Sequence, residues 1–391
     1  MEPLFKDQAD YDEFTTRHGN NHVKTGDLST YKGNCYLGID AGSTTTKIAL
    51  VSEDGDLLYS FYSNNNGSPL ATAIRSIQEI YAQLPEDAHI VHSCSTGYGE
   101  ALLKAALKLD DGEVETVAHY YAAAFFDPKV DCILDIGGQD MKCIKIKNQT
   151  VDSVQLNEAC SSGCGSLLRP SQVLKLLSTG FRKGSPFCKE PYRPRNQMYG
   201  FHELKGKAGP EGGRICRRYL SRTCLLSNKE CTFKVIKLSD ASDLGENIVV
   251  QGGTFYNDAV LRSFEKIAGV HATRPDIAGI MGAFGAALIA RERHEADYKT
   301  TMLTIDQINE LTYTTKLARC QGCTNHCLLT INKFSDNRQY ITGNRCEKGL
   351  GKEKNKDNIP NLFEYKNKRI FDYEHLTQRM LHTVQSASQE P

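Results

Sequence analysis

Residues 36–50 read YLGIDAGSTTTKIAL and combine residue types that suit a phosphate group and its metal ion. Asp40 ends an apolar run, where a carboxylate can hold a metal-bound water, and Gly42 lets backbone N–H groups approach an anion. Hydroxyl donors and a cation follow at Ser43, Thr44, Thr45 and Lys47. The spacing fits neither the P-loop pattern GxxxxGK(S/T) nor the dinucleotide-binding pattern GxGxxG. The alternative is an ordinary hairpin with a glycine in its turn.

Two later apolar runs end in the same manner. Residues 132–144, CILDIGGQDMKCI, place Asp135 before a turn, and residues 248–258, IVVQGGTFYND, place two glycines after a third run. Two acid-ended hairpins that face each other suit nucleotide chemistry with Mg²⁺, because the acids position the metal and water while the metal neutralises phosphate charge. The third run predicts a backbone contact with a nucleoside. The candidates for orienting the attacking water are Gln139 and Asp140, and those for lining the nucleotide are Gly137, Gly138, Gly252, Gly253 and Thr254.

A short cysteine-containing segment follows the second hairpin. In LNEACSSGCGS, Cys160 and Cys164 lie among serines and glycines, which leave sulfur accessible and offer N–H groups to an iron–sulfur cluster. The alternative is the start of a helix with two buried thiols, because a free cysteine usually behaves as a small apolar residue.

The order of these motifs resembles the actin/Hsp70/sugar-kinase ATPase superfamily. Within it, DIGGQDMK followed by LNEACSSGCGS resembles the BadF/BadG/BcrA/BcrD-type ATPases, the activators of 2-hydroxyacyl-CoA dehydratases. The resemblance covers residues 34–166 and 233–293. It implies a two-lobed α/β, actin-like (ribonuclease-H-like) fold that binds ATP and Mg²⁺ between its lobes at the residues named above.

The same resemblance implies partners and a redox cofactor. A homodimer would hold one [4Fe-4S] cluster at its interface, with Cys160 as a ligand. ATP hydrolysis would then drive a low-potential electron into a dehydratase-type acceptor protein, with a ferredoxin- or flavodoxin-like protein as the electron donor.

A second group of cysteines lies near the C-terminus at Cys320, Cys323, Cys327 and Cys346. Four sulfurs with this spacing can surround a [4Fe-4S] cluster, because three thiolates fall on one turn-rich loop. They could instead bind structural zinc, with Cys320 and Cys323 as a knuckle and His326 as a spare ligand, or stay unligated. The redox setting favours the cluster. This module resembles the cysteine-rich region of large fused activator/dehydratase proteins, so we expect the chain to be a fragment of one.

The 391 residues, 40% of them hydrophobic, are enough for two or three domains with substantial cores. We expect a polar connector at 1–34, the ATPase domain at 35–295, and a cysteine-rich module and tail at 296–391. Alternating strand and helix patterns in the middle segment predict α/β layers.

The charge balance gives no sign of a nucleic-acid or membrane partner, since 47 Lys and Arg match 47 Asp and Glu. No apolar run reaches bilayer-spanning length, and the acidic start is unlike a signal peptide. We therefore expect a cytoplasmic location. In that compartment, the fourteen cysteines suit metal ligands and core thiols better than disulfides.

Residues 167–232 differ from the rest of the chain, with fourteen Lys and Arg against four Glu and no Asp. A basic, disordered insert that binds nucleic acid is one interpretation. We hypothesise instead that the segment is translated out of frame, because single-base shifts of its codons permit stretches that resemble the family and join the in-frame sequence at Phe233. In the restored frame, the family's second cluster cysteine falls across Met198 and Tyr199. The chain as written lacks it, so we expect impaired cluster assembly.

Three functions compete on this evidence. The first is an ATP-hydrolysing iron–sulfur activator of a dehydratase. The second is a sugar or small-molecule kinase of the same superfamily, and the third is a non-catalytic metal-binding scaffold. No histidine receives a role, because His92, His119 and His271 have no nucleophile or acid at triad spacing.

Overall fold

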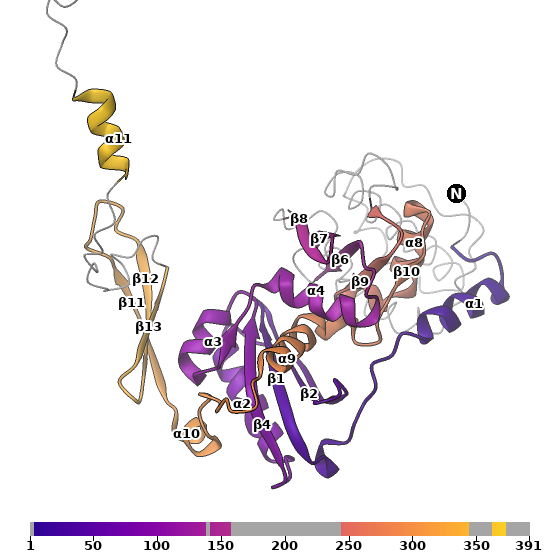
Figure 1. The fold of residues 1–391 in the computed structure, drawn as a ribbon, viewed down its shortest axis with the longest axis horizontal. Helices are drawn as coiled ribbons and strands as arrows, with labels where there is room; N and C mark the ends of the chain where they lie inside the picture. Colours follow the sequence, from indigo (N-terminus) through magenta and orange to yellow (C-terminus); the bar gives the residue numbers. More distant parts are fainter. Residues whose placement is uncertain (1–3, 138–140, 158–243, 344–361, 373–391) are drawn as a thin grey trace, which may run out of the picture. The chain divides into compact units, whose positions relative to one another are not determined.

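The computed structural model describes residues 4–137, 141–157, 244–343 and 362–372, and the chain divides into two compact units, Met1–Leu311 and Thr312–Pro391 (Figure 1). Each unit is considered by itself. The candidates that lie outside the described residues are Gly138, Gln139, Asp140, Cys160, Cys164, Cys346 and the segment 167–232.

The first unit contains two five-stranded sheets with the same topology. Their strand orders are β3-β2-β1-β4-β5 and β8-β7-β6-β9-β10. In each sheet the first three strands in sequence pair antiparallel, the fourth pairs with the first in parallel, and the fifth pairs with the fourth in parallel. The strands are β1 Gly33–Ala41, β2 Thr45–Ser52, β3 Leu57–Asn64, β4 Ala88–Thr96, β5 Asp111–Gly112, β6 Cys132–Ile136, β7 Met141–Lys147, β8 Thr150–Asn157, β9 Ile248–Gln251 and β10 Ala272–Thr273. This duplication confirms the expected two-lobed α/β fold.

Helices cover these sheets and connect them. They are α1 Gln8–Gly19, η1 Leu28–Thr30, α2 Pro69–Tyr81, α3 Glu100–Leu107, α4 Glu115–Phe126, η5 Gly253–Tyr256, α8 Asp258–Ala268, η6 Ala278–Ile280, α9 Met281–Arg293 and α10 Ile305–Glu310. Local sequence explains their ends: the Ser68 side chain caps α2, and Pro69 occupies its first turn, where its missing N–H costs nothing. No described helix is long and apolar enough to cross a bilayer.

Helix α9 packs against the first sheet and against α4 (Figure 1). Residues 281–290 are all buried, which fits a helix that is apolar on every side. A Cβ atom on Gly38 would lie 2.1 Å from the carbonyl oxygen of Ala283, and one on Gly285 would lie 1.8 Å from that of Ala118. The absence of side chains at these two glycines therefore lets α9 approach β1 and α4 with backbone against backbone.

The N-terminal residues are packed onto α8, which differs from the polar connector expected at 1–34. Phe5 and Phe14 are buried, and their rings meet edge to face. Arg17 donates two hydrogen bonds to Glu265, at 2.8 and 2.9 Å. The apolar side chains of this stretch are few and irregularly spaced, so their periodic signal was too weak to predict this docking.

The boundary between the units also differs from the one expected at residue 295. Tyr298, Thr300 and Thr301 donate hydrogen bonds to the carboxylate of Asp110, which fixes this stretch to the first unit. Helix α10 continues the attachment through contacts with α2. The first unit therefore extends to Leu311.

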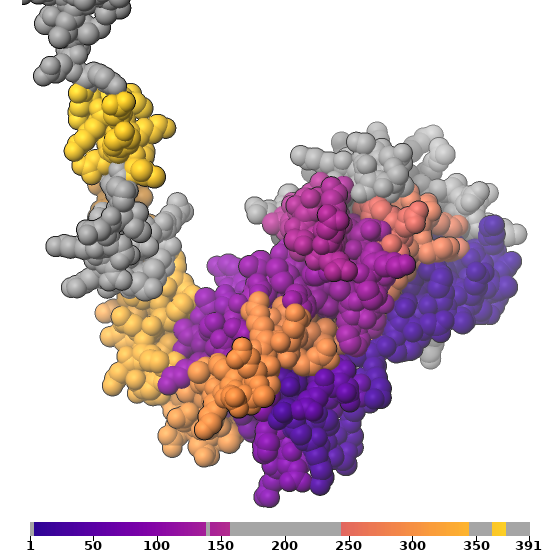
Figure 2. All heavy atoms as spheres, in the orientation of Figure 1, coloured from indigo at the N-terminus to yellow at the C-terminus, as the bar shows by residue number. Residues whose placement is uncertain are grey.

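The second unit has a three-stranded antiparallel sheet, β11 Tyr313–Arg319, β12 Leu328–Phe334 and β13 Gln339–Thr342, and a helix, α11 Leu362–Phe371. Every residue of α11 is exposed, and its spheres are drawn in yellow in Figure 2. Among the described residues of this unit, the buried side chains are those of Leu329, Asn332 and Phe334. The core of this part is therefore small.

The buried Glu265 makes the stability of the first unit depend on pH. Burial raises the pKa of Glu265, but hydrogen bonds from His18, Arg17 and the Ala272 N–H outweigh burial and lower it to about 2. A folded-state pKa below the unfolded value of 4.5 gives stability that is present above pH 4.5 and lost as the pH falls towards 2.

We therefore expect the free energy of unfolding to fall by about 2 kcal/mol more in the native chain than in Glu265→Gln between about pH 5 and about pH 3. Urea unfolding at a series of pH values measures the difference. Parallel pH curves for the two proteins would contradict this role of Glu265.

Candidate functional site

The two expected hairpins place an acid and a lysine at equivalent positions. Asp40 on β1 lies opposite Lys47 on β2, and Asp135 on β6 lies opposite Lys142 on β7. Both hairpins share the spacing D-x-G-x4-K. The duplication of the sheets therefore extends to the charged residues at their strand ends.

In the first hairpin, the acid and the lysine pair directly. Lys47 Nζ lies 2.7 Å from Asp40 Oδ2, and Asp40 is 1% exposed. Burial lowers the pKa of Lys47, but the charge of Asp40 and its hydrogen bond outweigh burial and raise it, so Lys47 is a cation. The other oxygen, Asp40 Oδ1, is buried with no hydrogen-bond partner among the described residues. A buried carboxylate oxygen of this kind fits a Mg²⁺-bound water.

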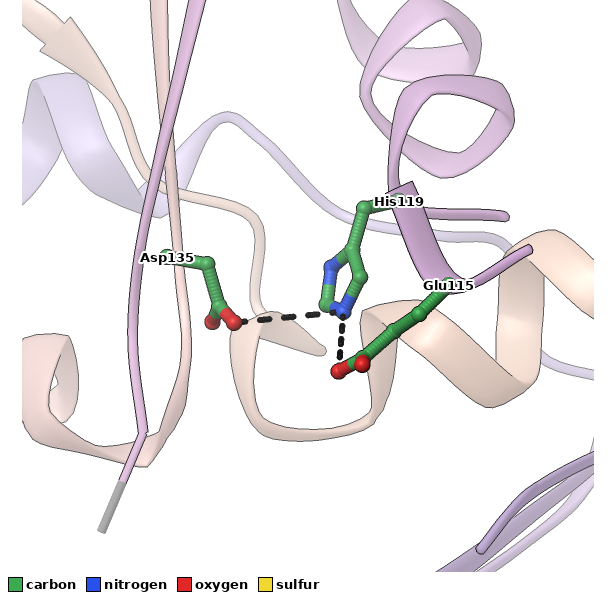
Figure 3. Close-up of side chains that lie close together, drawn as sticks. All are labelled: Glu115, His119 and Asp135. Atoms are coloured by element: carbon green, nitrogen blue, oxygen red, sulfur yellow. Dashed lines mark ion pairs between the residues drawn. The ribbon is translucent and has the colours of Figure 1, made fainter. Parts of the chain in front are cut away.

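The second hairpin is completed by two residues of α4. Lys142 Nζ forms an ion pair with Glu115 Oε1. One turn later, His119 Nε2 lies 3.7 Å from Glu115 Oε1 and 3.9 Å from Asp135 Oδ2, as Figure 3 shows. Burial raises the pKa of Glu115, but His119 and Lys142 outweigh burial and lower it. Glu115 is therefore ionised beside two cations.

Gln251 at the end of β9 fixes the tautomer of His119. The amide Nε2 of Gln251 donates to the backbone carbonyl of His119 at 3.0 Å, so Gln251 Oε1 is the atom that accepts from His119 Nδ1. The remaining ring nitrogen, Nε2, then faces the two carboxylates. Burial lowers the pKa of His119, but the charges of Asp135 and Glu115 outweigh burial and raise it. The two carboxylates therefore favour the protonated form of His119.

Two glycines allow these groups to come together. A Cβ on Gly282 of α9 would lie 2.7 Å from Asp40 Oδ2 and 3.3 Å from His119 Nε2. Gly252, with φ of +90°, has Asp135 Oδ1 at 2.8 Å from the corresponding position. The acid from the first sheet and the histidine between the sheets thus share the space over one glycine.

The turn of the first hairpin presents its polar residues near this site. The Gly42 N–H donates to the Thr45 carbonyl at 2.9 Å, while Ser43 is exposed and Thr44 is half-buried. Asn65 braces the turn: its side chain donates to the Gly42 carbonyl and its N–H to the Thr44 carbonyl, each at 2.9 Å. These hydrogen bonds brace the turn and leave Ser43 as its exposed hydroxyl residue.

The third glycine element lies against the second hairpin. Thr254 Oγ1 donates to the Gly137 carbonyl at 3.3 Å, and Gly252 packs on the strand that ends in Asp135. Nothing lies within 4 Å of the position of a Cβ on Gly253. The structure thus brings Gly137, Gly252 and Thr254 together and leaves Gly253 beside open space.

Residues 37–173 match the family model described as the BadF/BadG/BcrA/BcrD ATPase family. The chain is similar to this family over that segment. The resemblance found from the sequence motifs is therefore confirmed.

Two proteins to which the chain is similar are dehydratase activators. The chain is 26% identical to the (R)-2-hydroxyglutaryl-CoA dehydratase activating ATPase of Acidaminococcus fermentans, over 66% of the chain and 97% of that protein. It is 23% identical to the 2-hydroxyisocaproyl-CoA dehydratase activator of Clostridioides difficile, over 67% of the chain and 97% of that protein.

Solved structures of activators share the fold. The Clostridium difficile activator of 2-hydroxyisocaproyl-CoA dehydratase with bound ADPNP superposes with a TM-score of 0.52, at 21% identity, over 66% of this chain and 94% of the other. Component A of the Acidaminococcus fermentans (R)-2-hydroxyglutaryl-CoA dehydratase gives 0.51, at 24% identity, over 67% and 99%. These likenesses confirm the α/β ATPase architecture.

Four residues of this site were not assigned from the sequence: Glu115, His119, Lys142 and Gln251. The repeated D-x-G-x4-K spacing could have indicated Lys142. Glu115 and His119 are four residues apart and share a helix face, but nothing in that spacing names Asp135 as their neighbour. Their role depends on how α4 packs.

Gly282→Ala tests the close approach at the centre of the site. Alanine favours a helix by about 1 kcal/mol over glycine, so α9 itself is not weakened, but the added Cβ displaces Asp40 or His119. We expect the affinity for Mg²⁺-ADPNP to fall roughly tenfold, with at most about 1 kcal/mol lost from the free energy of unfolding. Calorimetry and urea unfolding measure the two quantities.

Gly19→Ala is the control, because nothing lies within 4 Å of its Cβ position. Unchanged nucleotide affinity in Gly282→Ala would overturn the assignment.

Proposed function

We propose that this chain is an ATP-hydrolysing activator that drives low-potential electrons into a 2-hydroxyacyl-CoA dehydratase-type partner. The observation that carries the proposal is the meeting of two D-x-G-x4-K hairpins around the buried side chain of His119. The activator relatives, which the chain matches over 97% of their length, support the same function.

The residues of the cleft suit a Mg²⁺-nucleotide. Asp40 offers its unpartnered Oδ1 to the metal or its water, and Asp135 approaches from the second sheet. Lys47 supplies a cation for the phosphates, and Gly253 offers open backbone to the nucleoside. Bound Mg²⁺ would neutralise charge on the transferred phosphate.

The position of this site couples it to the relation between the lobes. Asp40 ends a strand of the first sheet and Asp135 ends a strand of the second, so a nucleotide that contacts both favours one arrangement of the sheets. Helices α4 and α9 meet with Gly285 against Ala118, and a displacement at one helix is transmitted to the other. ATP hydrolysis would therefore change the relative arrangement of the two lobes.

The electron-transfer part of the proposal rests on Cys160, with Cys164 near it in sequence. It includes a [4Fe-4S] cluster shared by a homodimer, a ferredoxin- or flavodoxin-like donor and a cytoplasmic location. The resemblance of the sequence motifs to the family and the small residues around Cys160 support this part.

The out-of-frame hypothesis adds that this particular chain is impaired. The family match ends at residue 173, inside the unusually basic segment 167–232, which supports a change of reading frame there. Sequencing the DNA across codons 160–235 decides between a frameshift and a real insertion.

Asp135→Asn tests the catalytic site. Loss of one carboxylate charge at the metal should lower ATP turnover roughly a hundredfold in a frame-repaired chain, measured as phosphate release without any added acceptor. Asp152→Asn is the matched control, because Asp152 is an exposed acid of the same sheet that pairs with Lys147. Turnover that appears only when a sugar or another hydroxyl acceptor is added would instead indicate a kinase.

Frame repair tests the redox part. We expect anaerobically reconstituted, repaired protein to bind about four iron and four sulfide per dimer, and the chain as written to bind much less at this site, because it lacks the second cysteine. Iron and sulfide analysis, with absorbance near about 400 nm, measures the difference. Equal cluster content in the two proteins would contradict the impairment.

A further inference from the structure

The cysteines at 320–327 lie in the loop that joins β11 to β12. The Cys320 N–H donates to the Cys327 carbonyl at 2.9 Å, which extends the ladder one step beyond the pair Arg319 and Leu328. Residues opposite one another in an antiparallel pair direct their side chains to the same face. Cys320 and Cys327 therefore direct their side chains to the same face of the hairpin where the loop begins, and Cys323 lies in the turn between them.

The loop offers a hydrogen bond to one of these sulfurs. The Gly322 N–H donates to Cys320 Sγ at 3.4 Å, from two residues further along the chain. Backbone N–H donors to sulfur are a common feature of the loops that hold metal-bound cysteines. The Cys-x2-Cys turn is thus arranged as a metal knuckle through its backbone.

His326 is oriented by a second hydrogen bond. Its Nδ1 lies 3.2 Å from the Cys320 carbonyl oxygen, which can only accept, so Nδ1 carries the hydrogen. The lone pair is therefore on Nε2. Metal-binding histidines usually donate their other ring N–H to a carbonyl or carboxylate in this manner. His326 also adopts φ of +44°, which is uncommon for a residue with a side chain.

Exposure separates these cysteines from the other described ones. Cys35, Cys94, Cys132 and Cys143 are buried and act as small core residues, whereas Cys323 is exposed and Cys320 and Cys327 are half-buried. Leu329 and Phe334 are the buried apolar side chains of the described part of this unit. A module with so small a core commonly depends on a metal or another cross-link.

We propose that Cys320, Cys323, His326 and Cys327 bind a structural zinc ion that closes the tip of this hairpin. Three thiolates and one imidazole form a complete tetrahedral Cys3His set within a single loop, whereas a cubane cluster would need a fourth cysteine from outside the loop, such as Cys346. Each thiol releases its proton on binding, which leaves a net charge of −1 at the site. Arg319, whose guanidinium lies 3.5 Å from the His326 carbonyl, partly offsets that charge.

Binding requires the tip of the loop to close. No three of these four ligand atoms lie within 4.8 Å of one another, although a tetrahedral zinc site brings sulfurs to about 3.8 Å apart. The backbone hydrogen bond between Cys320 and Cys327 holds the base of the loop in place. Closure therefore involves the turn around Cys323. Zinc should therefore change the reactivity of all three thiols together.

The test uses the full chain, purified under reducing, anaerobic conditions, with and without one equivalent of zinc. Alkylation followed by peptide mass mapping gives the rate for each cysteine. We expect zinc to slow modification of Cys320, Cys323 and Cys327 on the order of tenfold, and EDTA to restore it. Native mass spectrometry should show about one zinc per chain.

Variants identify the ligands by cobalt substitution. Co²⁺ should give thiolate charge-transfer absorption, reduced by about a third in Cys323→Ser, with a changed visible band in His326→Ala. Thr324→Ala, in the same loop and without a ligand atom, should match the native chain. Alkylation rates unaffected by zinc, a Cys320–Cys327 disulfide in the mapped peptides, or protection that requires iron and sulfide would each overturn the zinc assignment.

Discussion

The first unit depends on balanced charge at the place where its two sheets meet. Three acidic side chains face three basic ones there: Asp40, Glu115 and Asp135 against Lys47, Lys142 and His119. Most of these side chains are removed from water, and an uncompensated buried charge costs several kcal/mol. Each residue of the set therefore constrains the others. A doubly charged metal and a polyphosphate can enter such a site together, because they bring charges of both signs.

This balance requires backbones to approach closely. Gly38 and Gly285 let α9 lie against β1 and α4, and Gly282 leaves room for Asp40 and His119 over one point of the helix. The apolar core supplies the stability, whereas the small residues determine which polar groups meet. The chemistry of the site is thus a consequence of packing as much as of the hairpins themselves.

The second unit has a different source of stability from the first. Its sheet has few buried apolar side chains among the described residues, so its hairpin cysteines matter more than they would in a large core. The hydrogen bonds to Cys320 Sγ and from His326 Nδ1 arrange a loop for a cation without filling space. In the first unit, acidic and basic side chains pair with one another. In the second unit, we assign the corresponding stabilising role to a metal ion.

The sequence by itself determined the features set by local spacing. The turn after Asp40, the turn after Asp135 and the glycines at 252 and 253 follow from short motifs, and the alternation of elements determined the α/β class. Only the tertiary structure decided that His119 lies between Asp135 and Gln251, residues far apart in the chain. The docking of Phe5 and the extension of the first unit to residue 311 were decided in the same way. Such contacts depend on the angle and depth at which helices pack, and no local periodicity encodes these quantities.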